Sequence, residues 1–126
     1  MRRFVSACFC LALILAAVAQ SAQAADTRVR LLVQSAPLAG LRYYAADQVW
    51  SELQLGDTVR LMRDPSNPHD GSAIGVHWQG HMLGYVPRRA NGTLSWALDR
   101  GDPLRARISR IEQRRARRLE IEVYVE

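Results

Sequence analysis

The sequence contains no lysine, and all 17 of its basic residues are arginines. This absence excludes every mechanism that depends on a lysine amine. The two cysteines, Cys8 and Cys10, lie near the start, so a chain processed after them can form no disulfide. The sequence also lacks a Walker loop, a cysteine cluster, a Ser-His-Asp arrangement and internal repeats. We therefore expect a single domain that is stabilised by packing, needs no cofactor and is not an enzyme.

The excess of positive charge is small. The formal net charge is +5 with 12 acidic residues, and it falls to +3 once Arg2 and Arg3 are removed. A mildly basic balance is compatible with a nucleic-acid partner, but it is equally typical of a domain from an arginine-rich proteome. Charge alone therefore does not identify the partner.

Residues 1–24 are predicted to be a cleaved secretory signal peptide. An arginine pair begins the segment, residues 5–18 are apolar, and Ala22-Gln23-Ala24 forms a small-x-small site before Ala25. The apolar run is shorter than the roughly 20 residues that a membrane-spanning helix needs. We therefore expect residues 25–126 to form one periplasmic or secreted domain, a monomer with no membrane anchor after cleavage.

The remaining chain is predicted to be mainly β. Alternation of apolar and polar residues indicates six strands, at 28–34, 57–63, 73–78, 82–86, 104–111 and 118–125. A helix with Leu94, Ala97 and Leu98 on one face would be capped by Asn91 or Thr93 and stopped by Gly101 with Pro103. The stretch 43–53 is compatible with a short helix. The expected inward residues are Val29, Leu31, Val33, Leu94, Ala97, Leu98, Leu104, Ala106, Ile108, Leu119, Ile121, Val123 and Val125. Six short strands favour a closed or half-closed barrel, because closure removes exposed strand edges.

The stretch 63–88 organises this domain. Pro65 and Pro68 restrict the backbone, and Asp70-Gly71 supplies a tight turn. Ile74, Val76 and Trp78 then alternate with smaller or polar residues, and a two-residue turn at 79–80 predicts a β-hairpin. The sequence therefore predicts a loop of defined shape that leads into two paired strands.

Several motifs in this stretch and before it resemble those of the HIRAN domain family. They are Arg-Asp-Pro-x-Asn-Pro-x-Asp at 63–70, Ala-Ile-x-Val at 73–76, Leu-Gly-Tyr-Val-Pro-Arg at 83–88, Gly-Leu-Arg-Tyr-Tyr at 40–44 and Leu-Gly-Asp at 55–57. The resemblance covers residues 29–124, and several motifs in one order make it specific. It implies a small six-stranded barrel of the oligonucleotide-binding (OB) type.

The candidate binding residues begin with Arg42, Tyr43 and Tyr44, a guanidinium beside two rings. This combination can hold a phosphate and stack a base, although the pattern alone equally allows one ring to be core and the other to cover it. In fork-remodelling members of the family, the matching positions help to bind the 3′ end of single-stranded DNA. The resemblance therefore implies a nucleic-acid site made of Arg42, Tyr43, Tyr44 and Asp70, with Arg89 or Arg88 on a phosphate.

Asp70 is the most informative of these residues. A carboxylate near a polyanion is unfavourable unless it accepts a hydrogen bond, and a free 3′-hydroxyl is a suitable donor. Such a contact would select strand ends over interior nucleotides. Asp70 can also close an Asx turn onto nearby backbone amides, and the two roles can coexist.

Other features leave alternatives open. His69, His77 and His81 match no established zinc pattern, so we expect no metal, and a metal-dependent hydrolase is the weakest interpretation. Five arginines at 110–118 form either a solvated face or an extended phosphate track. Because a signal peptide would take the domain away from replication forks, an envelope module that binds a peptide, glycan or other anion is the second interpretation.

Overall fold

The computed structural model describes residues 29–126. The predicted signal peptide and its cleavage site therefore lie outside the described residues. Within the described part, no helix is both long enough and apolar enough to cross a membrane.

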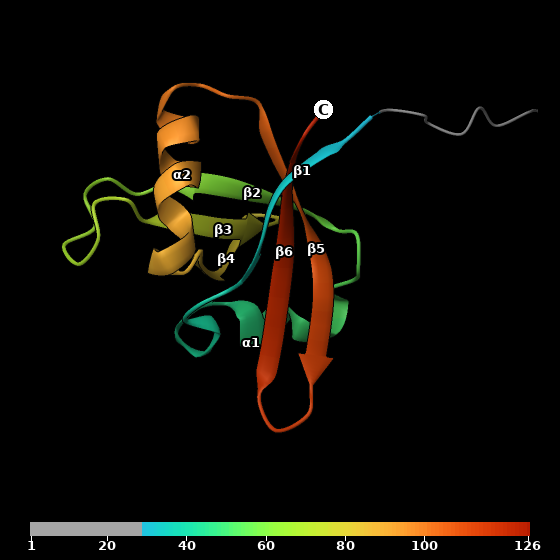
Figure 1. The fold of residues 1–126 in the computed structure, drawn as a ribbon. Helices are drawn as coiled ribbons and strands as arrows, with labels where there is room; N and C mark the ends of the chain where they lie inside the picture. Colours follow the sequence, from blue (N-terminus) through green and yellow to red (C-terminus); the bar gives the residue numbers. More distant parts are fainter. Residues whose placement is uncertain (1–28) are drawn as a thin grey trace, which may run out of the picture.

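Six antiparallel strands form one sheet, which confirms the prediction of a mainly β fold (Figure 1). The strands are β1 (Leu31–Pro37), β2 (Thr58–Arg63), β3 (Ile74–Trp78), β4 (His81–Tyr85), β5 (Leu104–Gln113) and β6 (Arg117–Val125). Their order in the sheet is β1-β6-β5-β2-β3-β4, with Leu31 at one end of β1 opposite Val125 of β6. The first strand of the chain therefore pairs with the last.

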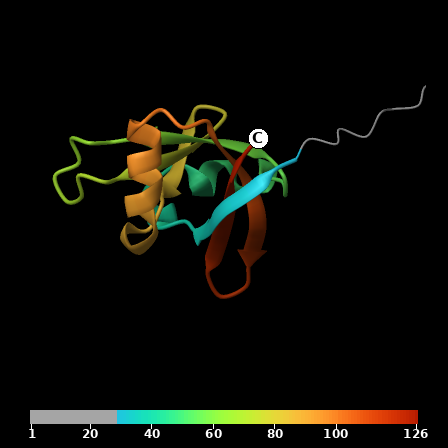
Figure 2. The same cartoon turned by 45° about the horizontal axis from the view of Figure 1, so that its top comes forward.

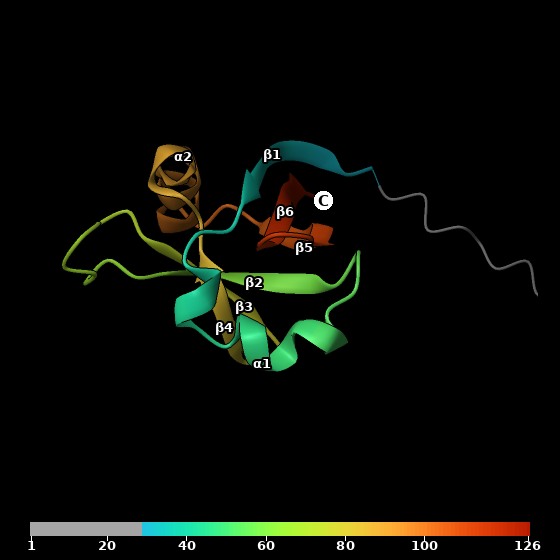
Figure 3. The ribbon, with the colours of Figure 1, turned by 90° about the horizontal axis from the view of Figure 1, so that it is seen from below.

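The sheet folds back on itself without closing completely. Seen from below, β1, β6 and β5 lie on one side of β2, and β3 and β4 lie on the other (Figure 3). Two residues beyond β1, Ala39 exchanges backbone hydrogen bonds of 2.8 and 2.9 Å with Tyr85 of β4 and so joins the two ends of the sheet at an isolated bridge. A Cβ on Gly84 would lie 2.5 Å from the Ala39 oxygen, so this approach requires glycine. The sheet is therefore not closed, and the predicted barrel describes it only loosely.

The core fills the space between the two sides of the sheet. Ile74, Val76 and Leu83 are fully buried on the β3–β4 hairpin. On the last two strands, the predicted inward set is confirmed for Ala106, Ile108, Leu119, Ile121 and Val123, whereas Leu104 and Val125 are partly buried. The period-2 pattern therefore identified the packed face of β5 and β6.

The predicted inward face of β1 is wrong. Val29, Leu31 and Val33 are 77%, 66% and 45% exposed, and β1 begins only at Leu31. As an edge strand β1 has a partner on one side, and a bulge between Leu32 and Gln34 interrupts its alternation. Ala36, at its other end, is the residue that β1 places in the core.

The long helix α2 (Arg88–Asp99) begins earlier than predicted, directly after Pro87. Neither Asn91 nor Thr93 is its N-cap: Asn91 lies within the helix and is buried, and Thr93 is exposed. Proline pre-forms the backbone at a helix start, and this competing signal sets the boundary. The predicted inward face is confirmed, since Leu94 is buried and Ala97 and Leu98 are half-buried.

Three short helical turns lie between 41 and 52 and overlap the ambiguous stretch 43–53. They are η1 (Leu41–Tyr43), α1 (Ala46–Val49) and η2 (Trp50–Glu52). Ala46 and Val49 are buried against the sheet, and the turns connect β1 to β2. This connection carries the candidate Arg-Tyr-Tyr residues.

Candidate functional site

The loop between β2 and β3 extends beside α2 and is shaped by its own side chains (Figure 2). Oδ1 of Asn67 accepts hydrogen bonds from the amides of His69 and Asp70, at 2.9 and 3.2 Å. Oδ1 of Asp70 accepts one from the Ser72 amide at 2.9 Å. The expected Asx turn at Asp70 is therefore present, and a second one at Asn67 precedes it.

Arg63 fastens this loop from the end of β2. Its guanidinium donates to the carbonyls of Ala73 and Gly71, at 2.8 and 3.0 Å. The same group forms an ion pair with Asp99 at the end of α2, with N and O 2.8 Å apart. One side chain thus connects β2, the loop and the helix.

Asp70 is also held by a residue inside α2. Nδ2 of Asn91 donates to Oδ2 of Asp70 at 2.7 Å, and Asn91 is only 2% exposed. This hydrogen bond is the main reason that the pKa of Asp70 is lowered, and the Ser72 amide and the charges of Arg88 and Arg63 act in the same direction. Asp70 therefore remains ionised at neutral pH and acts as an acceptor.

Asp70 lies at the edge of a hollow of about 230 Å³, which we call the Asp70 hollow. Its polar and aromatic lining residues are Tyr44, Asn67, His69, Asp70, Tyr85 and Arg88. The Tyr44 ring meets the Tyr85 ring edge to face, with centroids 5.5 Å apart. The Tyr85 hydroxyl donates to Asp64 at 3.2 Å, and burial followed by this contact raises its pKa. Part of the lining of the Asp70 hollow is therefore a pair of aromatic rings in contact with each other.

The start of α2 completes the Asp70 hollow. Pro87 and Arg88 both line it, and the Arg88 guanidinium donates to the His69 carbonyl at 2.7 Å. Among the described residues no side chain caps this helix end, and its first turn contains no acidic residue. The free amides and partial positive charge of such an end favour an anion.

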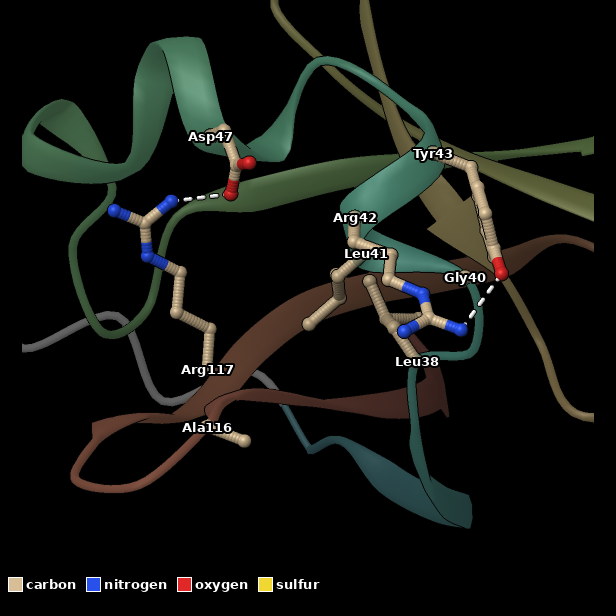
Figure 4. A pocket seen from close by; sticks show the side chains of 8 residues that line it. All are labelled: Leu38, Gly40, Leu41, Arg42, Tyr43, Asp47, Ala116 and Arg117. Atoms are coloured by element: carbon tan, nitrogen blue, oxygen red, sulfur yellow. Dashed lines mark hydrogen bonds and ion pairs between the residues drawn. The ribbon is translucent and has the colours of Figure 1, made fainter.

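A second hollow of about 680 Å³ lies between η1, α1 and the turn of the β5–β6 hairpin (Figure 4). We call it the Arg117 hollow; its lining residues are Leu38, Gly40, Leu41, Arg42, Tyr43, Asp47, Ala116 and Arg117. The Arg42 guanidinium donates to the Tyr43 hydroxyl at 2.7 Å. Arg117 pairs with Asp47, and its guanidinium lies 5.2 Å from the centre of the Trp50 ring. Both arginines are therefore oriented by neighbouring side chains.

Comparison with known proteins identifies the family. The family model described as HIRAN domain matches residues 31–126. The chain belongs to the HIRAN domain family. Its β1–β6 sheet and both hollows lie within the matched range.

Solved structures share this HIRAN fold. A crystal structure of a protein from Lactobacillus plantarum has a TM-score of 0.69 and 26% identity, covering 76% of this chain and 94% of that one. The crystal structure of the HIRAN domain of human HLTF has a TM-score of 0.61 and 24% identity, covering 75% and 77% of the two chains.

A curated relative matches a shorter part of the chain. The Fanconi-associated nuclease 1 homolog of Oryza sativa subsp. japonica is 45% identical over an alignment of 53 residues, and the match covers 39% of this chain. The matched part is only 6% of the nuclease. The similarity therefore concerns a small segment of a much larger protein.

The HIRAN fold divides the predicted site residues between the two hollows. Tyr44, Asp70 and Arg88 line the Asp70 hollow, and Arg42 and Tyr43 line the Arg117 hollow. Gly40, with φ 75°, turns the chain just before these residues. Both rings lie close to it, since an added Cβ would be 3.3 Å from Tyr44 and 3.8 Å from Tyr43. Tyr43 is 70% and Tyr44 38% exposed, so neither ring belongs to the core.

The other candidates lie apart from this group. Arg89 is exposed on the first turn of α2 and lines neither hollow. His69 lines the Asp70 hollow, but His77 is on β3, and His81 on β4 stacks on Trp78 with ring centroids 6.4 Å apart. Residues 29–126 contain no group of three His, Cys, Asp or Glu side chains that could hold a metal ion.

Sequence reasoning missed the role of Asn91. It was interpreted as a helix cap, although its spacing to Leu94, Ser95 and Leu98 matches one face of a helix. A buried asparagine on an apolar face needs a polar partner, and the partly buried Asp70 is that partner. Asp47 was also missed, because its pairing with Arg117 joins segments 70 positions apart.

Proposed function

We propose that this HIRAN domain binds single-stranded nucleic acid at its 3′ end and that it is not itself catalytic. The observation that carries this proposal is an ionised carboxylate, Asp70, in a hollow that also contains an aromatic wall and a helix N-terminus. The carboxylate can bind a hydroxyl, the aromatic wall can contact a base, and the helix N-terminus can bind a phosphate.

The carboxylate of Asp70 supports recognition of a terminal hydroxyl. Each of its oxygens accepts one hydrogen bond from the protein, from Ser72 or from Asn91. A carboxylate oxygen can accept two, so capacity for a ligand donor remains. A 3′-hydroxyl supplies that donor, whereas a 3′-phosphate would bring negative charge against the carboxylate.

The remaining groups suit the rest of the terminal nucleotide. The uncapped start of α2 and the Arg88 side chain offer donors to a phosphate. The partly exposed Tyr44 ring, fixed by Tyr85, offers a face for a base. Arg42 and Tyr43 lie beyond Tyr44, where the preceding nucleotide would pass.

The family adds support at a coarser level. HIRAN domains are linked to nucleic-acid binding, and the rice relative is a nuclease by name. We further propose that the domain acts as a monomer in the periplasm or outside the cell, on the basis of the signal-like residues 1–24. Its nucleic acid would then be extracellular or imported strands.

An anisotropy titration of residues 25–126 tests the proposal. Short labelled single strands that end in a 3′-hydroxyl should bind more tightly than the same strands ending in a 3′-phosphate. Asp70→Asn should shrink this difference, because the amide does not repel phosphate. The matched control is Asp102→Asn, since Asp102 pairs with Arg100 outside both hollows.

Two outcomes would contradict the proposal. Equal binding of free and phosphorylated ends would remove the recognition of a terminal hydroxyl. An absence of binding at low salt would reject nucleic acid altogether and favour the envelope module that binds a peptide, glycan or other anion.

A further inference from the structure

We propose that the Arg117 hollow and the turn of the β5–β6 hairpin form a second subsite, which binds the phosphodiester backbone of the same strand before its 3′ end. This inference rests on the proposed function. It assigns a role to Arg114, Arg115 and Arg118, which lie outside the motifs that resemble the family.

The hairpin carries positive charge that the protein does not neutralise. Within residues 29–126, Arg110 pairs with Glu112 and Glu120, and Arg117 pairs with Asp47. No carboxylate of this part of the chain lies within ion-pair distance of Arg114, Arg115 or Arg118; all three are exposed. Three free guanidinium groups near one turn are a suitable surface for a polyanion.

These arginines line a hollow that adjoins the Arg117 hollow. It has a volume of about 440 Å³ and is lined by Arg114, Arg115, Arg118, Ala116 and Glu112. Ala116 lines both hollows, so the two surfaces are continuous. The carboxylate of Glu112 is paired with Arg110, which reduces its repulsion of a phosphate.

The Arg117 hollow adjoins the Asp70 hollow at its other side. Tyr43 lines the first and Tyr44 lines the second, and the two residues are consecutive. Arg42 stands beside Tyr43 with its guanidinium 4.8 Å from the ring centre (Figure 4). A strand whose last nucleotide is in the Asp70 hollow can therefore continue past these side chains towards the hairpin.

The hairpin is held in place for this contact. Pairing of β5 with β6 continues to Gln113 opposite Arg117, immediately before the turn. Arg117 then joins the hairpin to α1 through Asp47 and Trp50. This pair also neutralises the one carboxylate that lines the Arg117 hollow, so the hollow does not repel phosphate.

The test compares strand lengths and two double variants of equal charge. Arg114→Ala/Arg115→Ala removes two hairpin arginines. The control, Arg60→Ala/Arg105→Ala, removes two exposed arginines that line a separate hollow on β2 and β5. Each protein is titrated with a dinucleotide and a ten-nucleotide strand, both with a 3′-hydroxyl, at several salt concentrations.

The hairpin variant should bind the ten-nucleotide strand several-fold more weakly, while its affinity for the dinucleotide stays unchanged. Its salt slope for the long strand should flatten by about 1.4 units, since each contact with a single strand contributes about 0.7. The control variant should lose much less affinity for the long strand.

Three results would overturn the second subsite. Equal losses in the two variants would indicate a general charge effect. Equal wild-type affinity for both lengths would leave end binding intact and remove the subsite. Failure of both strands to bind would reject the proposed function and the subsite together.

Discussion

The two hollows are constructed in different ways. Around the Asp70 hollow, Asn67, Asp70 and Asn91 form short hydrogen bonds, and Asn91 is buried. Around the Arg117 hollow, the main link between elements is the partly exposed ion pair of Arg117 with Asp47. A site fixed by directional hydrogen bonds can distinguish one chemical group from another, whereas a charged surface holds any phosphate. We therefore expect the first hollow to provide selectivity and the second to provide affinity.

The largest effect should come from the bridge between Ala39 and Tyr85, because both residues line the Asp70 hollow and Ala39 lies between Leu38 and Gly40 of the Arg117 hollow. Gly84→Ala would place a Cβ 2.5 Å from the Ala39 oxygen and force apart the bridge between Ala39 and Tyr85. We expect the free energy of unfolding to fall by about 1–3 kcal/mol, as for other overpacked positions. Both end preference and length dependence should weaken.

Chemical denaturation measures the loss, and Gly92→Ala is the matched control. Gly92 is in α2 with nothing within 4 Å of an added Cβ. That variant should gain about 0.5–1 kcal/mol, because alanine favours a helix more than glycine does. A Gly84→Ala protein as stable as the wild type would contradict the close approach of the two edges.

A smaller and more local effect is expected for Asn91→Ala. Loss of the hydrogen bond to Asp70 frees that carboxylate while leaving the Arg117 hollow intact. The preference for a 3′-hydroxyl over a 3′-phosphate should fall, and the additional affinity for long strands should remain. Parallel titrations measure both quantities. If the two fall together, the hollows are not independent.

Acid should also weaken the interactions that hold the Asp70 hollow, because protonation removes the charge of Asp70. The pKa of Asp70 is lowered below its usual range in the folded state, chiefly by the hydrogen bond from Asn91. Its stabilising contribution is therefore complete above about pH 4 and is lost as pH falls through the lowered pKa. Denaturation curves between neutral pH and about pH 3 should show a steeper loss for wild type than for Asp70→Asn. Asp99 and Asp102, whose pKa values are also lowered, are present in both proteins.

The smallest effect is expected at the ion pair of the Arg117 hollow. Asp47→Ala removes a partner that is 58% exposed, so we expect a loss of at most about 1 kcal/mol. Thermal unfolding at low and high salt measures it, and the difference from wild type should shrink as salt screens the pair. A loss as large as that of Gly84→Ala would show that the second hollow is also rigidly built.

Sequence patterns predicted the parts of the fold in which local chemistry and burial agree. Ile74, Val76 and Trp78 alternate on a strand that is central and packed, and Asp70 closes the turn that its side chain favours. The alternation at Leu31 and Val33 was equally regular, but these two side chains are exposed at the start of an edge strand. Periodicity shows which residues share a face and leaves open whether that face is covered.

The sequence allowed the candidate site residues to be named, but it did not show which of them lie together in space. Arg42, Tyr43 and Tyr44 are adjacent in sequence, yet the left-handed turn at Gly40 and the helical turn after it direct the two rings to different hollows. Asn91 satisfied the local rule for a helix cap, but Pro87 had already started the helix. In both cases the backbone conformation of a preceding residue, Gly40 or Pro87, decided the outcome.

The pairing of β1 with β6 determines when the site can assemble. Arg30 and Glu126, which are in contact, are 96 positions apart, and β1 has no strand partner other than β6 among the described residues. Joining such distant segments is slow, because the ordering of the intervening chain precedes the contacts that stabilise it. The turn that carries Arg42, Tyr43 and Tyr44 follows β1 directly. We therefore expect this turn to be held at its β1 end only once β6 has been synthesised, although contacts with β4 such as that of Tyr44 with Tyr85 can form earlier.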